Sequence, residues 1–218
     1  MTSTFSLADA QAVADLQTYL GRAGRVENGS VRLVADHGVL AVYTAVLYPH
    51  GLLDQTPTVL GLRVFQTDGE AAFDSVVPTR SLLDRLARAD HAEIRMPLEV
   101  STVTWAGISP PRGGWQQVGE TDAGLLKRVA AEGVDEVARA IPEGTGEQLV
   151  WRVRGSVWGA PIEELFDVPA GVAFAADSLG FLAEPDETVP IYEVGTWTRL
   201  SLRRGHVLVK RVPWTLKG

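Results

Sequence analysis

The chain has 218 residues and contains no cysteine, no long apolar run and very little lysine. The absence of cysteine excludes disulfide bonds, thiolate metal sites and cysteine nucleophiles. No apolar run approaches the roughly 18 residues of a membrane span, and the first residues lack the basic and apolar regions of a secretory signal. We therefore expect a cytoplasmic protein that has no membrane partner.

What is present is the composition of an ordinary globular protein, with 45% hydrophobic and 22% charged residues and a formal net charge of −7. A chain of this length can bury roughly 70% of its unfolded surface, so one large domain or two compact halves can fold without a metal. Arginine outnumbers lysine 17 to 3. A GC-rich genome imposes the same bias, so we do not count it as evidence for phosphate binding.

The first part of the chain shows helical spacing and then a period of two. Ser6-Leu7-Ala8-Asp9 fits a capping box and predicts a helix of about 16 residues that ends at Gly21 and Gly24. Two alternating segments flank Asp36-His37-Gly38, which predicts a β-hairpin. Further strands are predicted at 58–67 and 73–77, and Pro78 precedes a predicted helix at 81–88.

Residues 93–101 alternate most clearly, with the apolar set facing inward and Pro97 on the outward set. Proline cannot donate a hydrogen bond to a neighbouring strand, so this predicts an edge strand or a bulge. Residues 107–119 then hold the densest glycine and proline content. We interpret them as a linker or long loop between an N-terminal half, 1–106, and a C-terminal half, 120–218.

The C-terminal half repeats this alternation of helices and strands. An amphipathic helix is predicted from Thr121 to Ile141, and the alternation in 149–157 predicts a strand with Trp151 in the core. Pro161 marks a helix start, and strands are predicted from about 191 and 206. Helices mixed with antiparallel strands, without a βαβ order, indicate an α+β fold of mainly antiparallel sheets and amphipathic helices.

Two segments resemble each other. Phe73-Asp74-Ser75-Val76-Val77-Pro78 and Phe166-Asp167-Val168-Pro169 each precede a predicted helix. Two loosely similar halves would explain this, and so would the frequent use of Val-Pro as an entrance to a helix.

The run from Gly29–Leu33 through Val77–Leu83 to Ala92–Arg95 resembles the repeat unit of the DNA-polymerase sliding clamps, over residues 10–100. In that family basic helices line a ring around DNA, so the resemblance implies a clamp-like fold and association with nucleic acid. The charges oppose that function, because the helix predicted near residues 6–23 carries Asp9 and Asp15 against Arg22.

Motifs for catalysis and cofactors are missing. There is no dinucleotide or phosphate-loop motif, and Gly144-Thr145-Gly146 precedes a predicted strand rather than a helix. Ser156 lies one place too early for a nucleophile elbow. The four histidines, at 37, 50, 91 and 206, lack metal-ligand spacing. We therefore expect no catalytic site, no metal and no cofactor.

His50 is the histidine most open to a functional interpretation, because Asp54 follows it in a predicted loop. A hydrolase site built on His50 and Asp54 is one hypothesis, and a plain turn histidine is the other. Among the tryptophans, Trp115 in the Gly/Pro-rich segment is expected either to be exposed or to hold its loop against its own domain.

The C-terminus is the most distinctive region. From Thr196 onward there are six basic residues and no acidic one, so residues 1–195 carry a net −13. A two-residue turn at Arg204-Gly205 would pair Leu202 with Val207 and Leu200 with Val209. The outward face would then be a basic stripe, the candidate binding residues: Arg199, Arg203, His206 and Lys210.

Arg199 would lie opposite Lys210 in this hairpin, and like charges in that position repel, so an anionic neighbour is expected. The acidic part of the same chain could supply it, or the stripe could protect an edge strand from aggregation. An acidic protein partner, a second copy of the chain or a phosphate-bearing ligand are the functional alternatives.

These features favour a non-catalytic cytoplasmic binding or assembly protein, homo-oligomeric through its edge strands and charge asymmetry. A sliding-clamp-like protein associated with nucleic acid and a hydrolase using His50 and Asp54 are the alternatives.

Overall fold

A computed structural model describes residues 4–27, 29–51, 53–88, 93–100, 103–142 and 144–211. The chain divides into two compact units, residues 1–45 with 62–109 and residues 46–61 with 110–218. Strands β3 (Val39–Leu47) and β4 (Thr58–Gln66) contribute residues to both. The fold is α+β with an eight-stranded antiparallel sheet, which confirms the predicted class.

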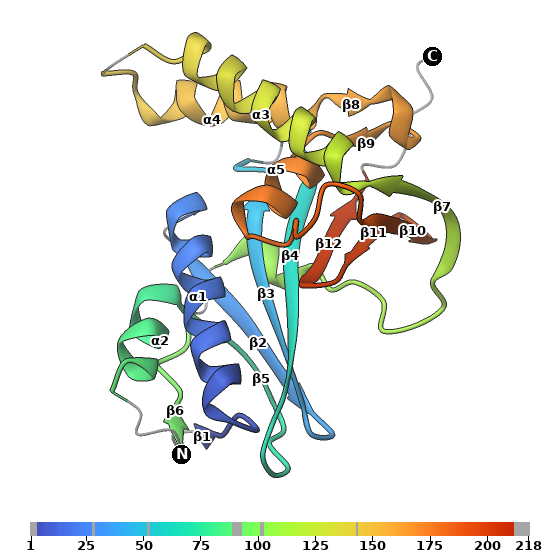
Figure 1. Ribbon diagram of the computed structural model, residues 1–218. Helices are drawn as coiled ribbons and strands as arrows, with labels where there is room; N and C mark the ends of the chain where they lie inside the picture. The colour runs from blue at the N-terminus through green and yellow to red at the C-terminus, as the bar shows by residue number, and fades with distance from the viewer. Residues whose placement is uncertain are drawn as a thin grey trace. The chain divides into compact units, whose positions relative to one another are not determined.

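In the first unit the strand order is β5-β2-β3-β4, with β2 at Ser30–Asp36 and β5 at Phe73–Pro78 (Figure 1). The β2–β3 hairpin is confirmed, and its turn residues His37 and Gly38 have φ of 48° and 77°. Helix α1 (Ala10–Val26) packs on β3, where the buried Tyr19 hydroxyl lies 2.8 Å from Thr44 Oγ1.

The remaining elements of the first unit are short. Helix α2 (Thr79–Leu86) directly follows β5, as predicted from Pro78. Strand β1 (Thr4–Phe5) pairs with β6 (Ile94–Arg95), and a 3-10 helix, η1, spans Thr104–Gly107.

Two predictions for the first unit are wrong in detail. The cap of α1 is Asp9, whose Oδ1 accepts from the Ala12 N–H at 2.7 Å, and the helix runs past Gly21 and Gly24 because its inner face is buried as far as Ala23. In the predicted strand 93–101 only Ile94–Arg95 is a strand, and Leu98 is 90% exposed. Pro97, which has no N–H to donate, interrupts the pairing.

In the second unit β4 is followed in the sheet by β12 (Gly205–Lys210), β11 (Trp197–Leu202), β10 (Thr188–Val194) and β7 (Gln116–Asp122). Helices α3 (Ala123–Ala140), α4 (Glu147–Gly159) and α5 (Gly171–Ser178) lie on one side of these strands (Figure 1). Asp122 caps α3 by accepting from the Leu125 N–H at 2.7 Å.

The segment between α4 and α5 holds β8 (Pro161–Ile162) paired with β9 (Val168–Pro169), and a 3-10 helix, η2 (Glu163–Leu165). The helix start predicted at Pro161 is therefore only a short 3-10 turn. In each unit a strand that ends in Val-Pro leads into a helix, β5 into α2 and β9 into α5. The division at 107–119 stays a prediction.

Residues 149–157 were predicted as a strand, and this is wrong because they lie in α4. Val150, Val153 and Val157 also fit helical spacing, and the unit uses that period. Trp158 is buried against Phe174, whereas Trp151 is 39% exposed rather than in the core. A helix, not a strand, thus follows Gly144–Gly146, although the lysine of a phosphate loop is still missing.

Candidate functional site

The residues of the predicted basic stripe lie in the β11–β12 hairpin, whose register differs from the prediction. Leu202 pairs with Gly205, so Arg203 and Arg204 form the turn, and the predicted turn at Arg204-Gly205 is wrong. The Phe181 ring occupies the space that a side chain at position 205 would need: a Cβ on Gly205 would lie 2.5 Å from Phe181 Cε1.

The corrected register brings three of the four predicted residues to one face. The cross-strand pairs on this face are Trp197–Lys210, Arg199–Leu208 and Ser201–His206. Arg199 therefore lies opposite Leu208 and not opposite Lys210, and the predicted repulsion between them is absent. Arg203 lies in the turn, where its backbone N–H donates to Glu187 Oε1 at 2.8 Å.

Arg199 lies against two aromatic rings. Its Cζ lies 4.6 Å from the ring centroid of Trp115 and 4.6 Å from that of Tyr192, distances at which cation–π attraction operates. We call this arrangement the arginine sandwich. Burial lowers the pKa of Arg199, but a guanidinium remains charged in proteins.

Trp115 links the segment before β7 to this face. Its indole N–H donates to the Pro111 carbonyl at 3.1 Å, and its ring packs on Arg199. Of the two expectations for Trp115, the structure has the one in which a loop tryptophan holds its loop against its own unit.

His206 lies on the same face as Arg199. Its Nδ1 lies 3.1 Å from Ser201 Oγ, and burial together with the nearby Arg199 cation lowers the pKa of His206. Glu193 pairs with Thr198 and so lies on the opposite face of the sheet, where its Oε1 lies 2.7 Å from Arg211 Nη2.

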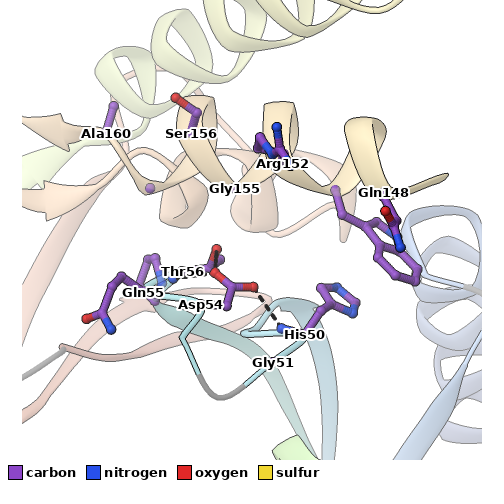
Figure 2. A pocket seen from close by; sticks show the side chains of 13 residues that line it. His50, Gly51, Asp54, Gln55, Thr56, Gln148, Arg152, Gly155, Ser156 and Ala160 are labelled. Carbon is purple, nitrogen blue, oxygen red and sulfur yellow. Dashed lines mark hydrogen bonds between the residues drawn. The ribbon is translucent and has the colours of Figure 1, made fainter. Parts of the chain in front are cut away.

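A separate pocket of about 730 Å³ lies between the loop at 50–57 and α4 (Figure 2). Two glycines on α4 allow the close approach: a Cβ on Gly155 would lie 2.7 Å from Thr56 Oγ1, and one on Gly159 would lie 3.4 Å from Pro57 Cδ. Trp151 and Arg152 of α4 line the same pocket. Sequence reasoning missed this pocket because it assigned α4 to a strand.

His50 and Asp54 both line this pocket, but Asp54 serves the loop. Its Oδ2 accepts from the His50 backbone N–H at 2.8 Å, and its Oδ1 accepts from the Thr56 N–H at 2.9 Å (Figure 2). Burial alone would raise the pKa of Asp54, but the hydrogen bonds from Thr56 and His50 outweigh it and lower the pKa. The carboxylate is thus a structural brace of the loop.

The His50 imidazole is stacked on one ring and lies near a second, tilted one. Its centroid lies 4.2 Å from that of Trp151, with 4° between the planes, and 4.5 Å from that of Tyr48. Within the described ranges no cluster of three His, Asp or Glu side chains could hold a metal ion. In the same residues no helix is both long and apolar enough to cross a membrane.

The chain was compared with family models and with curated proteins. Two family models match, a domain of unknown function (DUF8010) over residues 1–107 and another (DUF8185) over residues 110–214. The comparison with curated proteins gives no match.

Solved structures of DNA polymerase sliding clamps match nearly the whole chain. A DnaN sliding clamp (DNA polymerase III subunit beta) from Bartonella birtlesii, bound to griselimycin, is 17% identical with a TM-score of 0.55. The DNA polymerase III subunit beta from Pseudomonas aeruginosa is 15% identical with a TM-score of 0.55, and Caulobacter crescentus pol III beta is 13% identical with a TM-score of 0.53.

Each match covers 98% of this chain and 66% of the other, so the chain spans just under two thirds of the length of these proteins. The fold of this chain is that of a sliding clamp. The resemblance predicted over residues 10–100 is confirmed at the level of the fold and extends well beyond that range.

Proposed function

We propose that this chain is a non-catalytic cytoplasmic assembly protein with a sliding-clamp-like fold, which associates with copies of itself. The observation that carries the proposal is the likeness of 98% of the chain to proteins whose names describe them as sliding clamps or as the beta subunit of DNA polymerase III.

The pocket supports a non-catalytic role more than a hydrolase. A hydrolytic dyad needs a carboxylate that orients an imidazole, and Asp54 instead accepts hydrogen bonds from the backbone and from Thr56. The imidazole of His50 is stacked on the Trp151 ring. We therefore expect His50→Ala to leave any hydrolytic activity found in a broad substrate screen unchanged.

The charge distribution supports self-association. The C-terminal segment is +6 and the rest of the chain is −13, so the basic face of one copy can meet the acidic surface of another. Exposed charges attract less strongly as ionic strength rises. Association of this kind is therefore expected to weaken with salt.

Sedimentation velocity over a concentration series tests the proposal. We expect an oligomer at low salt that dissociates at high salt, and we expect Lys210→Glu to shift the equilibrium toward the monomer. Lys127→Glu on α3 is the matched control for the change in net charge. A monomer at every concentration in low salt would refute self-association.

A second candidate function is association with DNA, and the names of the matched structures favour it. The described helices carry similar numbers of acidic and basic residues, so their charge does not favour a polyanion partner. The affinity for duplex DNA, measured at several salt concentrations, tests this function. Phosphate contacts make the logarithm of the affinity fall linearly with the logarithm of the salt concentration. Absence of binding at low salt would exclude this function.

A further inference from the structure

Arg199 is a partly buried cation whose hydrogen-bonding capacity is unused in the part of the chain that the structure describes. Its Nε is shielded from solvent and has no hydrogen-bond partner. None of the ion pairs among the described residues includes Arg199. Leaving a buried donor of a charged group unpaired costs free energy. The guanidinium of Arg199 therefore has no acceptor among the described residues.

The two aromatic rings limit how an acceptor can approach. The guanidinium lies over the rings of Trp115 and Tyr192, and its Nε is enclosed, so an acceptor from outside would have to reach the terminal Nη1 and Nη2 groups. These two groups form a planar fork that matches two oxygens of a carboxylate or a phosphate.

The rings also hold the side chain in place before anything binds. An arginine loses substantial rotamer entropy when it is immobilised, and packing against Trp115 and Tyr192 has already removed that freedom. A ligand that meets a preorganised fork loses less free energy on binding. The sandwich therefore suits recognition better than a flexible surface arginine does.

The charges around the sandwich favour an anion. Lys210 lies on the same face and is in no ion pair with another described residue. Glu193 lies on the opposite face of the sheet, where it binds Arg211. An incoming anion would thus meet the two cations Arg199 and Lys210 on this face.

We propose that the arginine sandwich is an oxyanion site, which binds a carboxylate or phosphate group through the Nη1 and Nη2 groups of Arg199, with Lys210 as a second cation. The site goes beyond the proposed self-association, because a free anion can occupy it in the monomer. Where the chain does self-associate, a carboxylate of the second copy is the occupant that the same chemistry recognises.

The direct test is isothermal titration calorimetry of the full chain with inorganic phosphate. We expect Arg199→Gln to weaken binding about tenfold or more, and Arg204→Gln to change it by less than about twofold. Arg204 lies in the exposed turn of the same hairpin, so both variants lose the same charge and only one loses the fork. No phosphate binding to the wild type, or equal losses in the two variants, would overturn the site.

Near-UV circular dichroism shows whether Arg199→Gln keeps its folded environment. If it does not, Trp115→Leu is the second variant, because it keeps the cation and removes one ring. We expect it to weaken phosphate binding several-fold, and unchanged binding would count against the sandwich.

Sedimentation of the wild type with and without phosphate separates the two sources of oxyanion. Dissociation of an oligomer by phosphate identifies a carboxylate of the second copy as the occupant, and binding without dissociation identifies a free ligand. Both results support the site. A chain that is monomeric but binds phosphate through Arg199 would refute self-association alone.

Discussion

His206 makes the basic face sensitive to pH. Burial and the neighbouring Arg199 lower its pKa below the ordinary value of 6.5, so the folded state holds this imidazole neutral. In the unfolded chain the imidazole takes up a proton first as pH falls. The contribution of His206 to stability is therefore present above about pH 6.5 and is lost as the pH falls through the lowered pKa of the folded state.

We expect the free energy of unfolding of the wild type to decrease more between about pH 7 and pH 5 than that of His206→Gln. The glutamine cannot take up a proton but can still hydrogen-bond Ser201. Urea unfolding at a series of pH values measures both slopes. Equal slopes in the two proteins would show that His206 titrates alike when folded and unfolded.

The strand face of Arg199 could be predicted from the sequence, but its contacts could not. Its place on the same strand face as His206 and Lys210 follows from the alternation of the hairpin, which is local information. Its contacts do not, because Trp115 comes from the segment before β7 and Tyr192 from β10, which only the folded sheet brings together. The chemistry of Arg199 therefore depends on contacts that sequence spacing cannot contain.

At the scale of elements, glycines in helices mark where packing overrides propensity. Gly24 in α1 has open space around it, whereas a Cβ on Gly133 in α3 would lie 2.2 Å from Cζ3 of the buried Trp158. Alanine is better than glycine in a helix by up to about 1 kcal/mol. The two positions differ only in what surrounds them.

We therefore expect opposite signs for one substitution. Gly24→Ala should raise the free energy of unfolding by up to about 1 kcal/mol. Gly133→Ala should lower it by about 1–3 kcal/mol, because it must displace the indole of Trp158 from a packed site. Chemical denaturation measures both. Stabilisation of similar size at both positions would mean that α3 and α4 do not pack through Trp158.

The elements that were predicted correctly depend on local signals. The β2–β3 hairpin follows from its turn residues, and β4, β5, α2 and α3 follow from periodicity and Pro78. The errors have two origins. The apolar residues of α4 fit both the strand and the helix period, and the place of Gly205 against Phe181 depends on a distant contact. The pocket beside His50 could not be predicted once α4 was assigned to a strand.

At the scale of the whole molecule, a sliding-clamp fold is combined with a charge distribution that the net charge conceals. The formal −7 is the sum of a −13 portion and a +6 C-terminal segment. Part of that segment forms a defined face on β11 and β12, where Arg199 and Lys210 remain without acidic partners among the described residues. We therefore expect an assembly protein whose contacts are electrostatic.

Sedimentation velocity of the full chain at low and at high salt distinguishes an electrostatic assembly from a monomer. We expect an oligomer at low salt that dissociates as salt screens the charges. A sedimentation coefficient that stays at the monomer value in both conditions and at every concentration would contradict it.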